Sequence, residues 1–380
     1  MTLSGLGRAL HRVSGLARRW AALLSVLALV ALAGCAGEYP QSTIDPKTDF
    51  AETIHGLYVN VFWWTMLILA IVWIALAYVL VRFRARPDAP PPKPVHGHLG
   101  LEIGWTIGPA LIVVAIAVPT IKAVFETQRH PAEGAMVVEV IGHRYWWEFR
   151  YPETGVVTAN ELHLPVGRPV SLRLHTADVI HSFWVPQLGG KRDLNPLVRR
   201  PEGEEPRYNW LHFTVKEEGT FMGQCAEFCG EAHSLMRMRV VAESEDDFQA
   251  WTQRMLTVSE TALAPQADSA TGEVPAEDPL VAQGRQAFFG NVCVACHAIQ
   301  GTTAQGQLGP NLTRLGARSM IAAGLLENTQ ENLEHWIKRP YEVKPGVRMP
   351  GADQGGGGFP PTNLTDEQVH AIAAYLLSLR

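Results

Sequence analysis

The sequence predicts a multidomain membrane protein with three folded parts: a two-helix transmembrane hairpin, an all-β domain and a small all-α domain. Two apolar segments in the N-terminal third each hold about the ~20 residues that span a bilayer. Short segments rich in valine and aromatic residues then recur between residues 136 and 242, as in a small barrel or sandwich. Residues 279–380 change to apolar residues at helical spacing around a Cys-x-x-Cys-His motif.

Residues 1–34 have the features of a secretory signal. An apolar run, residues 21–33, follows four arginines: Arg8, Arg12, Arg18 and Arg19. The run ends in Leu-Ala-Gly-Cys, which resembles the bacterial lipoprotein signal, in which the cysteine is cut, diacylated and left as the new N-terminus. We therefore expect Cys35 to carry lipid and residues 35–52 to form a short N-terminal segment. An ordinary signal peptide with a stray cysteine is the alternative.

The predicted hairpin covers residues 53–126, with spans at Leu57–Val81 and Ile103–Val124. The loop between the spans carries four basic residues: Arg82, Arg84, Arg86 and Lys93. The positive-inside bias places this loop in the cytoplasm, so roughly 255 residues after the second span lie on the outer side, enough for two domains. Glu102 sits at the cytoplasmic end of the second span, where a lone carboxylate more often marks the lipid interface. A net charge of −5 and the lack of a basic cluster argue against a nucleic-acid partner.

The predicted β domain covers residues 127–245. Seven segments have strand-like composition: residues 136–142, 144–152, 160–166, 169–176, 179–186, 208–215 and 236–242. Turn residues such as Pro-Glu-Thr-Gly separate them, which is the pattern of a small barrel or sandwich. The stretch QCAEFCGEAHSLM falls in the loop before the last segment, so its side chains lie at one end of the domain.

That stretch places two cysteines, a histidine and a methionine close together. A copper site in a β barrel can combine such a loop with one remote histidine, here His181, and a weak axial methionine, here Met236. Two thiolates four residues apart, Cys225 and Cys229, can bridge two soft metal ions. Each copper then has one imidazole, and His233 supplies the second. A disulfide is the alternative, but it would leave the histidines and the methionine clustered around nothing.

A second redox motif follows a solvated linker, residues 246–278, which begins with a short predicted helix. Cys293, Cys296 and His297 form Cys-x-x-Cys-His, the attachment signal for c-type haem. A thioredoxin-like pair is the rival, but no strand precedes the motif. His/Met ligation raises the haem potential, and Met349 is the candidate for the second axial ligand. Met320 is the alternative, although its apolar neighbours at helical spacing indicate a core position.

With these motifs the chain resembles subunit II of the cytochrome c oxidases, whose copper pattern is C-x-E-x-C-x3-H-x2-M preceded by a distant His-Ser-Phe. Six residues match that pattern: His181, Cys225, Glu227, Cys229, His233 and Met236. The resemblance implies a cupredoxin-like barrel with a binuclear copper centre (CuA). It also implies that Glu227 offers its backbone carbonyl to copper and its side chain to a magnesium ion at the boundary with subunit I. The E-x-x-W-T pattern at Glu102 looks like the family's cytoplasmic proton-entry carboxylate.

Residues 279–380 resemble class I cytochromes c, as LGPNL and RMPG resemble their haem-edge and methionine loops. The whole chain is thus similar to the subunit II class with a cytochrome c fused at its C-terminus. The resemblance implies electron input to a proton-pumping haem-copper oxidase of the bacterial cytoplasmic membrane, in which oxygen is reduced in subunit I. The implied partners are oxidase subunits I and III, membrane lipid and an external donor, either a quinol-cytochrome c reductase or a soluble cytochrome c.

Two departures from the family pattern bear on function. The aromatic strand reads GHRYWW, so Tyr145 stands where the family has the surface tryptophan at which soluble cytochrome c delivers electrons. Electron entry from a free carrier at Tyr145 is therefore in doubt. The family's K-x-D-x-x-P-G-R loop keeps Lys191, Asp193 and Pro196 but gains a charged insertion between Arg199 and Arg207, which we interpret as a surface loop.

Two other functions remain open from the sequence. A copper-delivery or storage protein would use a similar loop, but would have little use for a covalent haem. An electron-donating subunit of another reductase, such as one acting on nitrous or nitric oxide, fits both cofactors. Co-purification with haem a and oxygen consumption distinguishes the oxidase from both.

Overall fold

The computed structural model describes residues 22–23, 25–26, 29–30, 39–84, 94, 96–128, 132–197, 206–266 and 274–380. The chain divides into two units, Met1–Pro40 and Gln41–Arg380. In the first unit, the described residues 22–23, 25–26 and 29–30 are helical. Cys35 lies outside the described residues, so its lipidation stays a prediction.

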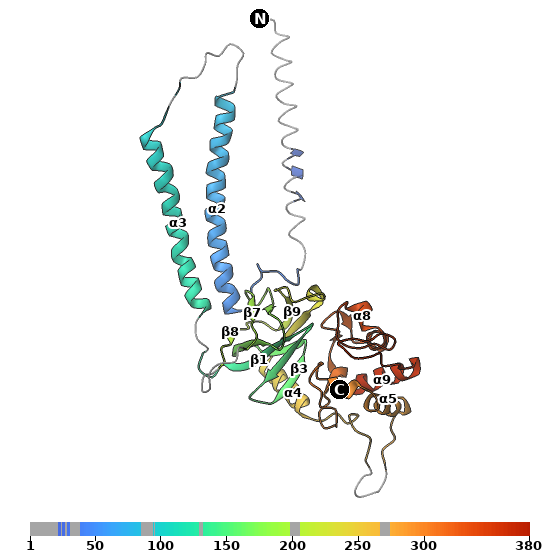
Figure 1. Cartoon of the computed structure of the whole chain (residues 1–380). Coiled ribbons are helices and arrows are strands. Elements are labelled where there is room, and N and C mark those ends of the chain that lie inside the picture. The colour runs from blue at the N-terminus through green and yellow to red at the C-terminus, as the bar shows by residue number, and fades with distance from the viewer. Residues whose placement is uncertain are drawn as a thin grey trace. The chain divides into compact units, whose positions relative to one another are not determined.

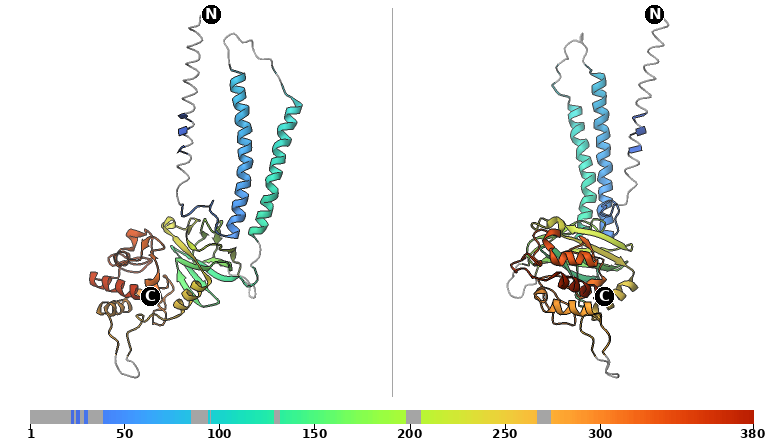
Figure 2. Two further views of the ribbon diagram at one scale, coloured as in Figure 1. Left: turned by 180° about the vertical axis from the view of Figure 1, so that it is seen from behind. Right: turned by 90° about the vertical axis from the view of Figure 1, so that its right-hand side faces the viewer.

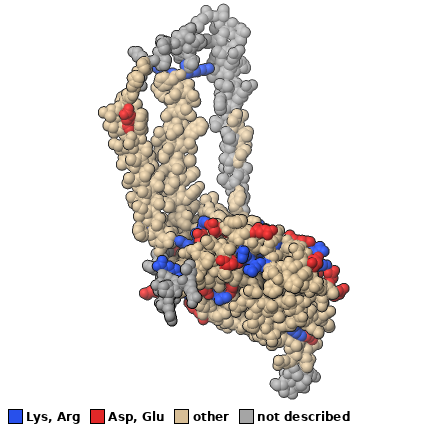
Figure 3. All heavy atoms as spheres, in the orientation of Figure 1, with Lys and Arg blue, Asp and Glu red and all other residues tan. Residues whose placement is uncertain are grey.

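The second unit begins with two long apolar helices, α2 (Asp49–Arg82) and α3 (Leu99–Thr127), which run side by side in all views (Figures 1 and 2). Both are long and apolar enough to cross a membrane. Figure 3 shows long uncharged stretches on them, with charge near their ends. The Thr48 hydroxyl caps α2 and the His98 ring caps α3. These polar first turns explain why both helices begin before the predicted apolar spans.

The start of α2 is joined to the β domain (residues 136–243) by specific hydrogen bonds. The Thr48 hydroxyl, which is fully buried, donates to the Leu188 carbonyl at 2.7 Å. The Asp49 carboxylate accepts the Thr214 backbone N–H at 2.8 Å. Phe50 is buried in the core of the β domain. The helix therefore meets the β domain through a packed joint.

The β domain consists of two five-stranded sheets with the orders β3-β2-β1-β5-β8 and β4-β10-β9-β6-β7. The strands of the first sheet are β1 (Met136–His143), β2 (Trp146–Tyr151), β3 (Val156–Ala159), β5 (Pro169–Thr176) and β8 (Asn209–Thr214). Those of the second are β4 (Glu161–Pro165), β6 (His181–Trp184), β7 (Arg192–Leu194), β9 (Gly219–Cys225) and β10 (Arg237–Glu243). Pairing is antiparallel except for β1 with β5 and β4 with β10. The inward residues of both sheets, Trp147 and Phe183 among them, form one core.

All seven predicted strand segments are confirmed as strands. Three further strands of the β domain, β3, β7 and β9, were not predicted. The segment of β9, GTFMGQC, alternates in burial, but two glycines stand where apolar side chains would signal a strand. The helix predicted at the start of the linker is confirmed as α4 (Glu245–Leu256), and Trp251 on it stacks on His163 of β4.

Residues 279–380 form a helical domain with its own core. Its elements are α5 (Pro279–Phe289), α6 (Cys293–Cys296), η2 (Leu315–Ala317), β11 (Met320–Ile321), β12 (Leu326–Glu327), α7 (Gln330–Lys338), α8 (Pro340–Val343) and α9 (Asp366–Ser378). The predicted Thr365 cap of α9 is confirmed, and Gln368 completes a capping box. The helical spacing assigned around Met320 is wrong. Met320 starts the strand β11, because Ala322, Ala323 and Gly324 take positive φ and turn the chain into β12.

Helices α5 and α9 cross at Gly284, where the two backbones are too close to leave room for a side chain. A Cβ there would lie 1.8 Å from the Ala371 carbonyl oxygen on α9. We expect Gly284→Ala to lower the free energy of unfolding of the helical domain by about 1–3 kcal/mol or more, because two packed backbones must separate. The exposed neighbour gives a matched control: Gln283→Ala adds a good helix former without a clash and should not destabilise the domain. Denaturant unfolding of the haem-loaded chain, followed at the haem absorption band, measures both. Equal midpoints for the two variants would contradict the requirement for glycine.

Candidate functional site

The predicted copper ligands come from three elements at one end of the β domain. His181 begins β6, Cys225 ends β9, and the loop after β9 leads through η1 (His233–Leu235) to Met236. Backbone hydrogen bonds fix this loop: Cys225 N–H donates to the Met236 carbonyl, and Ala226 N–H donates to the carbonyl of Ser182, both at 2.9 Å. The loop is therefore closed on itself and bonded to the strand that carries the remote histidine.

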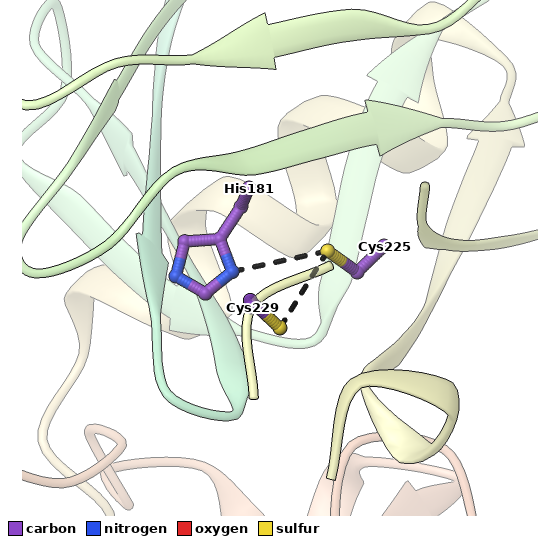
Figure 4. A group of neighbouring side chains, drawn as sticks. All are labelled: His181, Cys225 and Cys229. Atoms are coloured by element: carbon purple, nitrogen blue, oxygen red, sulfur yellow. Dashed lines mark hydrogen bonds between the residues drawn. The ribbon is translucent and has the colours of Figure 1, made fainter. Parts of the chain in front are cut away.

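The two sulfurs and the remote imidazole face one point (Figure 4). Cys225 Sγ lies 3.9 Å from Cys229 Sγ and 3.8 Å from His181 Nδ1, and the ligand atoms of the three residues lie within 4.8 Å of one another. All three residues are buried. A disulfide has its sulfurs about 2.05 Å apart. Both cysteines are free thiols, so the disulfide alternative is not what the structure shows.

The remaining predicted ligands surround this group. His233 Nδ1 lies 3.6 Å and Met236 Sδ 4.0 Å from Cys229 Sγ. The Glu227 carbonyl oxygen lies 3.2 Å from Cys225 Sγ. The structure thus brings together all six predicted copper residues. Two thiolates, two imidazoles, a thioether and a carbonyl form a soft donor set that fits copper.

Thiolate formation is favoured at one of the two sulfurs. The hydrogen bond from Cys229 and the contact with His181 hold the pKa of Cys225 at about 3, despite its burial. The hydrogen bond to Cys225 and burial raise the pKa of Cys229, and the negative charge on Cys225 adds to this effect. The pair therefore favours one thiolate, the form of cysteine that ligates soft metal ions.

Asp178, which sequence reasoning missed, orients the remote histidine. Its Oδ1 lies 2.9 Å from His181 Nε2, the ring nitrogen that faces away from the sulfurs. The N–H groups of Arg144 and Val179 donate to the same carboxylate. Burial opposes its charge, but these hydrogen bonds lower the pKa of Asp178 below its usual range. A carboxylate three residues before a ligand histidine was the signal that could have found it.

We expect Asp178→Asn to weaken copper binding roughly 10- to 100-fold, the usual cost of losing a carboxylate that supports a ligand histidine. A chelator competition titration of the full chain measures this. Asp246→Asn, at an exposed first-turn position of α4, changes the same charge and should leave affinity unchanged. Equal affinities for the wild type and Asp178→Asn would show that the carboxylate does not support the ligand.

The side chain of Glu227 points away from the sulfurs. Its Oε2 pairs with Lys191 Nζ at 3.0 Å, and both side chains are about half exposed. Lys191 Nζ also lies 3.4 Å from the Ala226 carbonyl. The carboxylate is thus accessible at the domain surface, and Lys191, kept from the family loop, is its present partner.

The predicted haem residues line one cavity. Cys293 and Cys296 lie on α6, and His297 follows directly. Met349 lies in the segment after α8 and lines the same cavity. His297 Nδ1 lies 2.7 Å from the Pro310 carbonyl, which fixes the ring and leaves Nε2 free. Burial lowers the pKa of His297 and so favours the neutral ring that metal ligation requires. Two free thiols, a neutral imidazole and a thioether in one mostly apolar cavity fit a covalent c-type haem. Met320 also lines the cavity.

Residues of the β domain complete the cavity wall. Arg144, Tyr145 and Trp146 line it together with the haem residues. Tyr145 is 8% exposed, and its hydroxyl accepts the backbone N–H of Glu231, two residues beyond Cys229, at 3.1 Å. The position predicted as a possible entry point for electrons is therefore covered by the helical domain and linked to the loop of residues 225–236, which carries most of the predicted copper ligands (the copper loop).

Glu102 is the one predicted site residue in the hairpin, and the structure gives it a local role. Its Oε1 accepts the His98 backbone N–H at 3.2 Å, one turn earlier at the start of α3. The side chain thus helps cap the helix. A role in proton uptake stays a prediction.

Three family models match separate parts of the chain. They are described as the transmembrane domain of cytochrome c oxidase subunit II (residues 40–123), its periplasmic domain (155–245) and cytochrome c (281–380). Cytochrome c oxidase subunit 2 of Alkalihalophilus pseudofirmus is 37% identical over 363 residues, which cover 94% of this chain and 96% of that one. This chain belongs to the cytochrome c oxidase subunit 2 family.

Other relatives match different shares of the chain. Cytochrome c oxidase subunit 2 of Bacillus subtilis is 33% identical over 94% of this chain and 97% of its own length. Quinol oxidase subunit 2 of Bacillus cereus is 31% identical but covers only 64% of this chain. Among solved structures, the periplasmic domain of subunit II of cytochrome oxidase from Bradyrhizobium japonicum is 26% identical over 31% of this chain and 91% of that one, with a TM-score of 0.28. The cytochrome c oxidase subunits 2 of Alkalihalophilus pseudofirmus and Bacillus subtilis thus match this chain along nearly its whole length.

Proposed function

We propose that this chain is the electron-input subunit of a respiratory haem-copper oxidase. It accepts electrons at a haem c held by Cys293, Cys296, His297 and Met349. It passes them through a two-copper centre in the β domain to haem in subunit I, where oxygen is reduced to water with proton pumping. The external donor is either a quinol-cytochrome c reductase or a soluble cytochrome c.

The observation that carries this proposal is the buried group of two free thiols 3.9 Å apart with an imidazole beside it. Two thiolates at this spacing can be shared by two metal ions, and sharing lets one electron spread over both, so that bond lengths change little on transfer. The protein residues supply the rest. Asp178 holds His181, and the closed loop holds both cysteines. The core around Trp147 excludes water from the site. The rings of Trp147 and His181 meet edge-on, with their centroids 6.1 Å apart.

The chain is anchored in the membrane by α2 and α3, with the β and helical domains on the periplasmic side. We propose that Cys35 adds a lipid anchor. Glu102, at the cytoplasmic end of α3, is proposed to receive protons for subunit I. The exposed Glu227 carboxylate is proposed to bind magnesium at the boundary with subunit I, where it would exchange Lys191 for the metal. Subunit III is the further expected partner.

Two features of the structure argue against copper delivery: the burial of the predicted copper ligands and the haem cavity of the helical domain. A delivery protein needs an open loop that exchanges metal, whereas Cys225, Cys229 and Met236 are each at most 5% exposed. It also needs no second cavity with haem ligands. The structure therefore favours electron transfer over metal transfer.

Isolation of the full chain with its membrane partners tests the function. We expect an oxygen-consuming complex that contains haem a, with two coppers and one c-type haem per copy of this chain. The near-infrared spectrum should show a mixed-valence copper pair. One copper per chain, or a matured protein with a Cys225–Cys229 disulfide, would rule the proposal out.

A further inference from the structure

A short turn of the helical domain, Lys344-Pro345-Gly346, contacts the copper loop of the β domain. Lys344 is 2% exposed, and its Nζ donates to the Tyr145 backbone carbonyl at 3.0 Å. Gly346 takes a φ of +77°, and a Cβ there would lie 2.7 Å from Glu231 Oε2 and 2.9 Å from Glu231 Cβ. Both positions of the turn are thus fitted to partners that are more than a hundred residues away in the sequence.

A lysine nitrogen at this depth is costly unless it is paired. Besides the Tyr145 carbonyl, Lys344 Nζ lies 5.9 Å from the centre of the Trp336 ring, within cation–π range. Burial lowers the pKa of Lys344 to about 7. Lys344 therefore bridges Trp336 in one domain and Tyr145 in the other, and separation of the domains would remove the hydrogen bond.

Tyr145 is the residue through which this contact reaches both cofactor sites. Its side chain lines the haem cavity, and its hydroxyl accepts the Glu231 N–H of the copper loop. There is no room for a side chain at Gly230, where a Cβ would lie 2.5 Å from the Tyr145 hydroxyl. Met349, the proposed haem ligand, lies five residues after Lys344. One segment of the helical domain thus carries a haem ligand and also contacts the residue beside the copper loop.

We propose that the Lys344–Gly346 turn is a docking element that seats the helical domain on Tyr145 and so makes electron transfer between the two cofactors fast. Lys344 is a positioning residue, since it acts through Tyr145. The inference rests on the proposed function and extends it: the rate is set by a specific contact as well as by the covalent linker. A further contact between the two domains, in which Ser319 Oγ donates to Glu161 Oε1 at 2.8 Å, lies beside the haem cavity and does not involve Tyr145 or the copper loop.

The test measures intramolecular electron transfer in the full chain, loaded with copper and haem in detergent. A photoexcited dye reduces the haem, and the decay of the reduced haem band and the bleaching of the near-infrared copper band are followed. We expect Lys344→Met to slow this transfer about tenfold or more, as for loss of a buried hydrogen bond that holds a docked state. Gly346→Ala should slow it similarly by steric conflict with Glu231, without removing the lysine. Lys338→Met is the control. It removes a lysine of the same domain that pairs with Asp366, and electron transfer in this variant should proceed at the wild-type rate.

The spectra and potentials of both cofactors separate docking from folding. The inference requires that they stay at wild-type values in Lys344→Met and Gly346→Ala while the rate falls. Wild-type rates in both variants, or a fall that accompanies altered haem or copper spectra, would overturn it. If the wild-type chain itself passes no electrons from haem to copper, the proposed function fails first, and the inference fails with it.

Discussion

Replacement of Cys229 by serine is expected to abolish the two-copper centre. Cys229 Sγ is the atom that approaches Cys225, His233 and Met236 together, at 3.9, 3.6 and 4.0 Å. A serine hydroxyl is a hard, protonated donor and cannot replace a bridging thiolate. We expect copper to fall from two ions to at most one per chain. Oxidase turnover should fall by more than the roughly 10- to 100-fold that loss of a supporting carboxylate costs.

Copper analysis, near-infrared absorption and oxygen consumption of the purified complex measure the effect. Ser182→Ala is a matched control, because Ser182 is equally buried beside His181 and its hydroxyl has no hydrogen-bond partner among the described residues. That variant should keep both coppers and full turnover. Two coppers per chain in Cys229→Ser would show that the sulfur does not bridge, and the proposed centre would have to be abandoned.

Replacement of Met349 by alanine is expected to leave the haem attached but to open its sixth coordination position. Attachment depends on Cys293 and Cys296, and His297 stays fixed by the Pro310 carbonyl. Because His/Met ligation raises the potential, its loss should lower the haem potential by on the order of 0.1 V. The reduced protein should then bind carbon monoxide, which the six-coordinate wild type should not. Redox titration and the carbon monoxide difference spectrum measure both effects.

Met320→Ala is the control, since Met320 lines the same cavity from β11. It should keep the wild-type potential and stay closed to carbon monoxide. If carbon monoxide bound the reduced Met320→Ala protein but not the reduced Met349→Ala protein, the second axial haem ligand would be Met320.

Most of the residues proposed to bind cofactors were predictable because their spacing is local. Cys225 to Met236 and Cys293 to His297 lie in short motifs whose chemistry shows in residue order, and the structure places each set together. The strand β9 was missed because Gly219 and Gly223 stand where a strand usually shows apolar side chains. The chain turns at Ala322 through backbone angles that sequence spacing does not reveal, which explains the wrong helical assignment around Met320.

Long-range contacts were beyond sequence reasoning. Lys344 and Tyr145 are 199 residues apart, and nothing in KPGVRMPG indicates that its lysine is buried against a carbonyl. Tyr145 was correctly noted as a departure from the family pattern, but its covering by the helical domain depends on how two separately folded segments pack. Asp178 had a local signal, three residues before His181, that was available and not used.

The joint between α2 and the β domain has a mechanical consequence. Thr48 and Asp49 form hydrogen bonds with the backbone of the β domain, so no flexible segment separates the start of α2 from that domain. The copper loop therefore belongs to a domain whose position relative to the start of the membrane helix is fixed by direct hydrogen bonds. The helical domain is joined covalently through a long polar segment and otherwise through side-chain contacts such as Lys344 with Tyr145. Evolution can then lengthen, shorten or replace the donor module without disturbing the distance that electrons must cover into the bilayer.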